Sequence, residues 1–498
     1  MGKFYVTTAI DYVNAEPHIG HTYQKVIADV LARWHRLSGE EVFFLTGTDE
    51  HGQKIARSAE AAGLAPKEFS DQNSAKFLEA WKKLGINFDK FIRTTDPEHK
   101  LIVQKFAQKI KGDIYKGVYE GLYCVGCEAY ITEKELVNGR CPFHPDKIPE
   151  PLKEETYFFK LSKFEKKLLE FYSKNPDCIL PRKRANEIIN RVKEGLKDLS
   201  ISRKNLTWGI PYPEDNSLVI YVWFDALLNY ITALDWPNGK NFKKFWPADI
   251  ELLGVDNSWF HCVIWPAMLM SAGIKPAKTI FVHGFLTFNG QKISKSLGNV
   301  ISPIYLAGKY GADSTRYYIC RQFVFGEDGD FSEKTLAERH NNELANELGN
   351  LLNRSLSLIE KDFQGKIPNA RTNAELQKKL DLKKIQKYME KFELHMALSE
   401  IFSFINACNK FVNDRQPWKQ SGKELEETLY SVADALRIIS ILLSPFIPET
   451  SEKINSQLGV KAGTLKDCKF NLLKAGTQAK KGEVLFKKIE IEKEAGKK

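Results

Sequence analysis

The tetrapeptide His18-Ile19-Gly20-His21 is the first candidate for chemistry, because it follows a strand-like segment and opens a helical pattern. The unpaired backbone N–H groups and the partial positive charge of a helix N-terminus suit a phosphate group. Gly20 has no Cβ, so a nucleotide could approach the backbone closely. His18 and His21 share one helical face and could donate hydrogen bonds to phosphate oxygens. Taken alone, the tetrapeptide fits two ordinary capping or surface histidines equally well.

A second candidate is the segment Lys292-Ile293-Ser294-Lys295-Ser296, which sits in a Gly-bearing loop (Asn289-Gly290-Gln291) just beyond the last strand-like stretch. Two flexible cations beside hydroxyl groups on a mobile loop can neutralise the charge that builds on a departing pyrophosphate. Lysine pairs on loops are most often simply solvated, so this segment by itself would not establish a site. The histidine tetrapeptide and this loop, however, lie in order at opposite ends of one predicted domain.

A third candidate is the pair of short motifs Cys124-x2-Cys127 and Cys141-x2-His144. Three thiolates and one imidazole at this spacing are typical of a closed, tetrahedral structural Zn²⁺ site. All four ligands come from the protein, which leaves no open position for catalysis. The other five cysteines are scattered, and we expect them to be small buried residues in a protein without a disulfide framework.

Hydrophobic periodicity predicts the elements that position these residues. Short aromatic and β-branched segments alternate with helical patterns over the first half of the chain. This alternation predicts an α/β fold with a doubly wound, Rossmann-like parallel sheet. The expected strands are 4–10, 42–46, 218–223, 250–253 and 279–282.

Two further regions depart from that rhythm. Residues from about 112 to 202 hold the cysteine cluster and several prolines, so we expect an insertion between two halves of the sheet domain. Beyond about residue 332 the strand signals vanish, and helical periodicity predicts an α-helical bundle. The lysine-bearing stretch 474–498 has few large apolar residues, which predicts a frayed or partner-contacting tail.

Composition excludes several classes of protein. The chain has 498 residues, of which 43% are hydrophobic and 27% charged, with a formal net charge of +10. Intrinsic disorder needs fewer apolar residues, and a spanning helix needs about 20 consecutive apolar ones, which no segment approaches. The N-terminal residues lack the features of a signal peptide, so we expect a soluble, cytoplasmic protein with no membrane partner. The positive charge is compatible with a nucleic-acid partner but does not by itself indicate one.

The two signatures together resemble the HIGH and KMSKS motifs of the class I aminoacyl-tRNA synthetases, with Ile293 in place of Met. Within that class the chain is similar to the methionyl-tRNA synthetases over nearly its whole length. The segments that carry the resemblance are 8–12, 47–52, 221–227, 260–261 and 265–269. One departure is Gly254-Val255-Asp256-Asn257, where the family usually reads Gly-Lys-Asp-Ile. Asp256, the expected ribose acceptor, is retained, whereas the lining contributed by residues 255 and 257 stays open.

The resemblance implies ATP-dependent activation of L-methionine to methionyl-adenylate, with release of pyrophosphate. Transfer of the methionyl group to the 3′ end of tRNA(Met) would follow, for initiation and elongation of translation. Catalysis is expected to involve His18, His21, Lys292 and Lys295. ATP, carried with Mg²⁺, would contact these four residues together with Gly20, Asp256 and Ser294.

A pocket selective for methionine should combine aromatic faces with few polar groups, because the substrate side chain is apolar and carries a soft sulfur. By resemblance, its walls are Ala9, Ile10, Tyr12, Trp223, Ala226, Leu227, Tyr230, Phe260, His261 and Trp265. Asp49 at the end of a strand is the natural anionic partner for the substrate ammonium. Plain core packing is the competing interpretation of the aromatic residues.

Two helical segments are expected to bind RNA. Asn346, Asn350 and Arg354 recur every four residues and can hydrogen-bond the edges of splayed bases. Asn413, Arg415 and Trp418 place an aromatic ring beside a rigid turn, which suits base stacking. In the methionyl enzymes both segments match the residues that read the anticodon. Without the resemblance, helix capping and interhelix hydrogen bonds are the more common roles of such asparagines.

The expected division of the chain has six parts. These are the first half of the catalytic domain (1–112), the connective insertion with the zinc knuckle (113–205), the second catalytic half (206–285), the signature loop and stem-contact region (286–335), the helical anticodon-binding domain (336–472) and the tail (473–498). We expect one Zn²⁺ and a monomer, while a separate RNA-binding subunit stays possible. The alternatives are a branched-chain or cysteinyl synthetase and a non-catalytic, zinc-bearing RNA-binding homologue.

Overall fold

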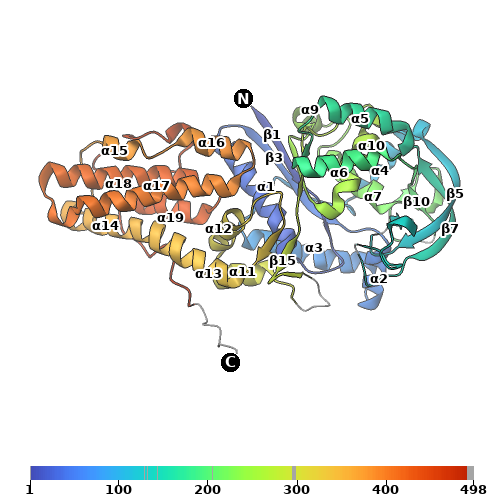
Figure 1. Cartoon of the computed structure of the whole chain (residues 1–498), viewed down its shortest axis with the longest axis horizontal. Helices are drawn as coiled ribbons and strands as arrows, with labels where there is room; N and C mark the ends of the chain where they lie inside the picture. Colours follow the sequence, from blue (N-terminus) through green and yellow to red (C-terminus); the bar gives the residue numbers. More distant parts are fainter. Residues whose placement is uncertain are drawn as a thin grey trace.

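The computed structural model describes residues 2–490, apart from 128, 132, 143, 205 and 294–298 (Figure 1). Within these residues a seven-stranded, wholly parallel sheet has the order β2-β3-β1-β13-β14-β8, with β4 also paired to β3. Its strands are β1 (Lys3–Thr8), β2 (Asp11–Tyr12), β3 (Glu41–Asp49), β4 (Lys90–Arg93), β8 (Ile179–Leu180), β13 (Ile250–Gly254) and β14 (Ile280–His283). The predicted doubly wound α/β fold is confirmed.

Helices cover both faces of the sheet, as a parallel sheet requires. Side chains alternate along β1, so that Phe4 and Val6 enter one hydrophobic core and Tyr5 enters the other. The first core includes residues of α1 (Ile19–Leu37) and α3 (Pro66–Lys83). The second includes residues of α4 (Pro97–Lys109) and α10 (Trp265–Ala272). The short helices α2 (Gln53–Ala61), α8 (Asn229–Thr232) and α9 (Lys240–Phe245) complete this half.

The prediction of a parallel-sheet strand at 218–223 is wrong both in where the strand ends and in which sheet it belongs to. Strand β12 (Asp215–Ile220) pairs antiparallel with β10 (Ser202–Arg203) and β11 (Pro211–Tyr212) in a separate small sheet. The chain then turns into helix α7 (Val222–Leu227), so Trp223 lies on a helix. A short, continuous apolar run does not distinguish a buried strand from a buried helix turn, which is why the sequence misplaced this boundary.

Residues 113–205 supply a four-stranded antiparallel sheet. Its long pair joins β5 (Ile114–Cys124) to β7 (Glu150–Phe159), with β6 (Ala129–Ile131) and β9 (Leu199–Ser200) beside them. Helices α5 (Glu165–Lys174) and α6 (Arg182–Lys193) follow. The same range also contributes β8 to the parallel sheet, where it pairs with β14.

A small sheet and two helices connect the half that contains the parallel sheet to the helical half. The sheet consists of β15 (Leu286–Phe288), β16 (Gln291–Lys292) and β17 (Gly329–Phe331), and the helices are α11 (Pro303–Tyr310) and α12 (Ala312–Gln322). Arg316 of α12 is fully buried and ion-pairs with Asp29 of α1 at 2.6 Å. Its guanidinium also donates to the carbonyls of Pro445 and Phe446, each at 2.9 Å. This arginine therefore ties the sheet domain to the helices that follow.

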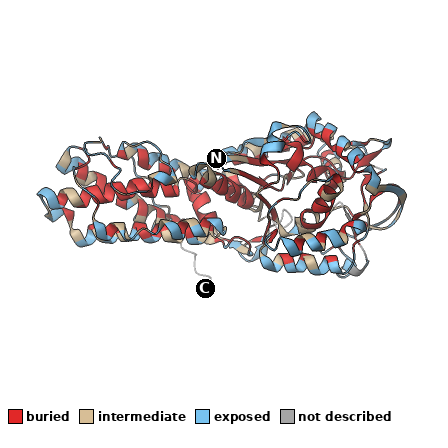
Figure 2. Ribbon diagram, turned by 90° about the horizontal axis from the view of Figure 1, so that it is seen from above, coloured by how far each residue is buried: buried red, intermediate tan, exposed pale blue. Residues whose placement is uncertain are grey.

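The second half is helical, as predicted. It comprises α13 (Glu333–Arg339), the π-helical stretch η7 (His340–Gly349), α14 (Asn350–Phe363), α15 (Ala374–Gln377), α16 (Leu382–Glu390), α17 (Leu394–Arg415), α18 (Gly422–Leu443) and α19 (Pro448–Leu458). Figure 2 shows buried residues running through both halves of the elongated molecule. None of the described helices is both long enough and apolar enough to cross a bilayer.

The expectation of a frayed tail is wrong for residues 474–490. Asn341 exchanges two hydrogen bonds with the backbone of Ile489, at 2.8 and 2.9 Å, and His340 Nε2 lies 2.7 Å from the carbonyl oxygen of Lys487. Upstream, the N–H of Lys480 donates to the carbonyl of Gln457 at 2.8 Å. The segment has few large apolar residues, but Leu485, Phe486 and Ile489 pack against the first core, and backbone groups of the segment hydrogen-bond to helices, which composition does not reveal.

Candidate active site and metal centre

The tetrapeptide begins α1 and caps it. His18 is the N-cap residue; its Nδ1 accepts from the N–H of Gly20 at 3.1 Å, and its own N–H donates to Nδ1 of His21 at 3.2 Å. The two rings lie 3.9 Å apart. Because each Nδ1 accepts a hydrogen bond, the neutral rings carry their protons on Nε2. A Cβ on Gly20 would lie 2.9 Å from the His18 ring, so glycine permits this cap.

The two histidines are thus hydrogen-bond donors of fixed orientation. Burial lowers the pKa of His21 well below its ordinary value, with smaller contributions from His18 and Lys25. His21 therefore stays neutral near pH 7 and can donate its Nε2 proton in a hydrogen bond without carrying charge. From the sequence, helix capping and phosphate contact were alternative roles for these histidines. The two roles are compatible in this geometry because they use different ring nitrogens.

The residues expected to bind substrate gather where parallel strands end. Ala9 follows β1 and donates its N–H to the carbonyl of Leu252 in β13 at 2.8 Å. Asp49 ends β3, and Asp256 lies in the turn that follows β13. Ligands of doubly wound sheets bind at this carboxyl edge. The strand order therefore brings together residues that are up to about 250 positions apart in the sequence.

The described residues on either side of the second signature are a hairpin before it and a segment after it that contacts the start of α1. Lys292 belongs to β16, opposite Thr287, and the two-residue turn Asn289-Gly290 has the positive φ values of 50° and 74° that a tight hairpin requires. The N–H of Ile19, at the start of α1, donates to the carbonyl of Ile301 at 3.0 Å. Ser294 and Lys295 lie outside the described residues.

Aromatic side chains from two elements meet in the expected methionine pocket. Trp223 of α7 stacks on Phe260 with ring centroids 3.9 Å apart and an interplanar angle of 3°. His261 lies edge-on to Trp223 at 6.2 Å. Phe260 and His261 belong to η5 (Phe260–Ile264), a π-helical turn directly before α10. The structure therefore brings these three predicted residues together.

His261 is held in one tautomer. Its Nδ1 lies 2.9 Å from the carbonyl oxygen of Asn257, so Nδ1 carries the proton, and Nε2 accepts from the hydroxyl of Tyr230 at 2.7 Å. Burial lowers the pKa of His261 to about 4, so the ring is neutral. Tyr230 and Trp265 are fully buried, with ring centroids 5.8 Å apart, and form the floor behind the half-buried rings of Trp223 and Phe260.

The remaining predicted pocket residues occupy different depths. Tyr12 is half-buried and donates its hydroxyl proton to the carbonyl of His51 at 3.0 Å. Ala226 and Leu227 are buried on α7, and Leu227 belongs to the second core. Ile10 is half-buried and packs against that same core.

Sequence reasoning missed a buried polar network under α7. Asp225 accepts from His51 Nδ1 and His99 Nε2, both at 2.6 Å, and His99 Nδ1 lies 2.7 Å from the hydroxyl of Thr232. Burial alone would raise the pKa of Asp225, but the two histidines outweigh it and lower the pKa below its ordinary value. The network anchors the helix that carries Trp223. His51 and Asp225 lie in segments 47–52 and 221–227, which carry the family resemblance, but nothing in the sequence indicated that they form a network or that His99 belongs to it.

A second buried acid, Glu251, lies within β13 behind the pocket floor. Its Oε1 accepts from the indole N–H of Trp265 at 3.1 Å. Burial raises the pKa of Glu251 to about 8, so the group is protonated at neutral pH. The sequence singled out neither its burial nor its contact with Trp265.

Cys124, Cys127, Cys141 and His144 converge as their spacing predicted. Their ligand atoms all lie within 4.8 Å of one another. Cys127 Sγ is 3.4 Å from Cys141 Sγ and 3.2 Å from His144 Nδ1. A Cβ on Gly126 would lie 2.5 Å from the His144 ring, so a glycine is needed where the turn passes the histidine. Three sulfurs and one nitrogen at this separation can hold a metal ion.

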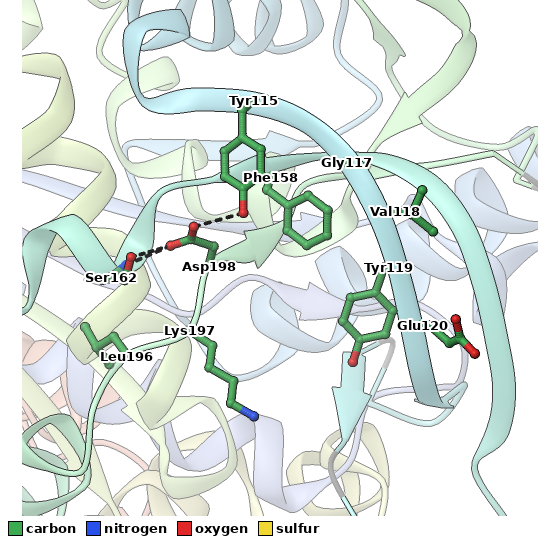
Figure 3. Close-up of a pocket in the computed structure, with 10 residues that line it drawn as sticks. All are labelled: Tyr115, Gly117, Val118, Tyr119, Glu120, Phe158, Ser162, Leu196, Lys197 and Asp198. Carbon is green, nitrogen blue, oxygen red and sulfur yellow. Dashed lines mark hydrogen bonds between the residues drawn. The ribbon is translucent and has the colours of Figure 1, made fainter.

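A hollow on the outer sheet is separate from all these residues. Tyr115, Tyr119, Phe158 and Lys197 are among its lining residues (Figure 3). Asp198 accepts at its rim from the hydroxyl of Tyr115 at 3.0 Å and from that of Ser162 at 2.6 Å. No residue that the sequence predicted for a site lines this hollow.

The predicted RNA-binding segments lie side by side in the helical half. Arg354 of α14 donates to Asn413 Oδ1 of α17 at 2.7 Å, and to both oxygens of Asn409 at 2.7 and 3.0 Å. Asn346 and Asn350 are exposed, and the side chain of Trp418 in η8 (Pro417–Lys419) is 54% exposed. Arg415 lies 3.8 Å from Glu427. Asn409 was missed, because its contact depends on how two helices pack.

Comparison with known proteins decides the family. The family described as "tRNA synthetases class I (M)" matches residues 4–148 and 144–356, and the "Anticodon binding domain of methionyl tRNA ligase" matches 365–497. The chain is 47% identical to the methionine--tRNA ligase of Caldanaerobacter subterraneus subsp. tengcongensis, over 99% of this chain and 80% of that protein. The corresponding ligase of Thermotoga maritima is 45% identical over 98% of this chain and 80% of that protein.

The chain belongs to the methionyl-tRNA synthetase family.

Solved structures of the methionyl-tRNA synthetase family match as well. The Mycobacterium tuberculosis enzyme in complex with methionyl-adenylate superposes with a TM-score of 0.94 at 39% identity, covering 98% of this chain and 100% of that one. The free form of that enzyme gives a TM-score of 0.87 at 36% identity, covering 99% of each chain. The methionyl anticodon-domain match extends through the packed segment 474–490. These full-length matches to ligases give no support to the non-catalytic alternative.

Proposed function

We propose that this chain is a methionine--tRNA ligase that activates L-methionine with ATP and transfers it to the 3′ end of tRNA(Met). The observation that carries the proposal is the stacked Trp223–Phe260 pair beside a neutral His261, at the carboxyl edge of a sheet whose first helix is capped by His18. Membership in the methionyl-tRNA synthetase family supports the same activity.

In the first step the methionine carboxylate attacks the α-phosphorus of ATP, and pyrophosphate leaves. No covalent enzyme intermediate forms, so catalysis consists of positioning and charge stabilisation. His18 and His21 donate from Nε2 to phosphate oxygens, while Gly20 leaves room for the nucleotide. Lys292 and Lys295 neutralise the departing pyrophosphate, and Ser294 and Asp256 contact ATP and its ribose.

Methionine is held between the aromatic wall and Asp49. The apolar side chain packs against Trp223 and Phe260, and the ammonium pairs with the Asp49 carboxylate. Tyr12, Ala9 and Ile10 close the pocket from the β1 side. In the second step the terminal ribose hydroxyl of the tRNA takes the methionyl group, and AMP is released.

The metal implied by the four knuckle ligands is a single structural Zn²⁺, because three thiolates and one imidazole are its preferred set. Bound zinc would stabilise the fold of the knuckle and supply no step of the reaction. Mg²⁺ would enter with ATP. Elemental analysis should give one Zn²⁺ per chain, and Cys141→Ser should reduce it towards zero; a value near two or near zero in the unmodified protein would refute the single-site assignment.

In the helical half, Asn346, Asn350 and Arg354 would read the anticodon, together with Asn413, Arg415 and Trp418. We propose that the six-part division of the chain reflects these roles, and that the protein acts as a cytoplasmic monomer. A further RNA-binding subunit would change affinity but not the anticodon contacts.

ATP–pyrophosphate exchange measured with each amino acid in turn tests the function. Exchange that depends on methionine, followed by charging of tRNA(Met), is the expected result. Exchange stimulated by cysteine or a branched-chain amino acid instead would reassign the substrate. Absence of exchange with every amino acid would refute the activity.

A further inference from the structure

We propose that the knuckle (residues 123–144) is coupled to the aromatic wall (Trp223, Phe260 and His261) through direct contacts, so that metal binding at the knuckle increases the affinity for methionine. The inference rests on the proposed function of the wall as part of the methionine pocket. Three contacts, from three different elements, connect the two regions.

The first contact is a direct hydrogen bond. The indole N–H of Trp223 donates to the carbonyl oxygen of Cys127 at 3.2 Å. The same indole stacks on Phe260 at 3.9 Å. Because Cys127 also supplies one of the four candidate ligand atoms, a metal that holds its sulfur also holds the carbonyl that orients Trp223.

The second contact is a buried arginine between two rings. The Arg203 guanidinium lies 5.6 Å from the ring of Tyr123 and 4.2 Å from that of Tyr221. Tyr123 directly precedes Cys124, and Tyr221 is the N-cap residue of α7. Arg203 is only 6% exposed, and a cation over aromatic faces is held more strongly when it is desolvated.

The third contact reaches the other side of the wall. Arg191 of α6 donates to Glu135 of the knuckle at 2.7 Å and stacks over Trp259 at 4.0 Å. Trp259 directly precedes Phe260. Because the Glu135 and Arg191 side chains are about half exposed, solvent screens this ion pair and makes it the weakest of the three contacts.

Strand pairing of β5 with β6 and β7 joins the knuckle to the outer sheet, but the knuckle has only a small hydrophobic core of its own. Its own core consists of Cys124, Ile131 and Cys141 among the described residues, far less than an independent hydrophobic core needs. Binding energy at such a metal site is folding energy for the surrounding turn. Loss of the metal should therefore loosen the Cys127 carbonyl and leave Trp223 free to reorient, so that methionine binding must order it again.

Calorimetric titration of the full chain with L-methionine tests this coupling. The zinc-loaded protein is compared with protein stripped by a chelator. Stripping should raise the dissociation constant about fivefold, the change that corresponds to one lost hydrogen bond. An unchanged constant would overturn the proposal.

Variants decide whether the effect passes through these contacts. The double variant Trp223→Phe/Arg203→Met keeps a ring against Phe260 but removes the indole donor and the guanidinium. Removal of the metal should change the dissociation constant of methionine from this double variant less than twofold. Trp246→Phe is the matched control, because that indole donates to the carbonyl of Lys275 at 2.9 Å, and it should keep the full metal response. An equal response in the double variant and the control would overturn the proposal.

Backbone hydrogen exchange provides a readout that needs no methionine. Stripping should accelerate exchange in 221–227 and 259–265, while 436–443 of α18 should not change. Unchanged exchange in the first two segments would overturn the coupling. If the loaded protein bound no methionine at all, the proposed function would fail, and the exchange comparison alone would decide the coupling.

Discussion

The proposed catalytic edge of the sheet and the proposed RNA-binding surface of the helical half differ in how their side chains are held. At the sheet edge, His21 and His261 are kept neutral by burial, and His261 is also held in one tautomer. On the helical side, Asn346, Asn350 and Trp418 are exposed to solvent. Chemistry on a phosphate needs donors that do not reorganise during the reaction, whereas reading a flexible RNA loop tolerates side chains that settle on contact.

This difference predicts where substitutions act. A change at the sheet edge should alter protonation, catalysis or stability, depending on which hydrogen-bonded or buried group it removes. A change on the exposed RNA side should leave the fold and adenylate formation intact and affect only charging.

The largest expected effect concerns Glu251. A glutamate releases its proton near pH 4.5 when unfolded but near pH 8 in the folded protein, because burial raises its pKa. The folded state therefore binds more protons between these values, and stability falls as pH rises from about 4.5 to about 8. Glu251→Gln should remove this loss of stability, which approaches about 5 kcal/mol above pH 8. Chemical denaturation at pH 5, 7 and 8.5 measures it.

Glu333→Gln is the control of opposite sign. Burial opposes ionisation of Glu333, but hydrogen bonds from Tyr310, Lys309 and Tyr305 outweigh it and lower its pKa. That variant should be less stable than the unmodified protein at neutral pH, and the difference should vanish in acid. Equal pH dependence of Glu251→Gln and the unmodified protein would show that Glu251 is ionised in the fold.

His18→Asn separates capping from catalysis. Asparagine is a good N-cap, so the helix should keep its stability, but the Nε2 donor is lost. Methionine-dependent ATP–pyrophosphate exchange should fall about 10²-fold, on the order of 3 kcal/mol, mostly in kcat. His18→Ala should lose the same activity and also about 1 kcal/mol of stability. Near-normal exchange in His18→Asn would mean that the histidine is a cap and nothing more.

Trp418→Ala tests the exposed side of the comparison. Loss of one stacked base should weaken tRNA binding by about 1–3 kcal/mol and slow charging at low tRNA concentration. Exchange without tRNA should stay unchanged, because the residue lies in the helical half. A parallel fall of exchange and charging would instead make Trp418 a packing residue.

The smallest effect is expected for Asn413→Ala. Its Oδ1 accepts from Arg354, so the variant removes one bond that orients the guanidinium and should raise the KM for tRNA between twofold and tenfold, or about 0.5–1.5 kcal/mol. Asn409→Ala is the matched comparison, because Arg354 also donates to that side chain. A loss larger than that of Arg354→Ala would indicate that Asn413 touches RNA directly.

Much of the fold was predictable because its signals are periodic. Four of the five expected strands overlap strands of the parallel sheet, and the helical half follows from its apolar repeat. The exception at 218–223 and the packed segment 474–490 share one cause. In both, contacts with other segments of the chain, rather than local composition, decide the conformation.

The sequence by itself determined the features whose parts are close together in the chain. These are the histidine tetrapeptide at the start of a helix, and the Cys124-x2-Cys127 and Cys141-x2-His144 ligand pairs. Spacing was sufficient there, because a few residues of chain leave few ways to arrange the groups.

Only the tertiary structure decided which distant groups became partners. Asp225 hydrogen-bonds to His51, 174 positions away in the sequence, and to His99, 126 positions away. The indole of Trp223 donates to the carbonyl of Cys127. The guanidinium of Arg354 donates to Asn409 and Asn413. Each of these contacts depends on how two separately formed elements pack, and periodicity specifies which face of an element is buried but not what it meets. The protonation states of His261 and Glu251 follow from the same packing, since burial is their main cause.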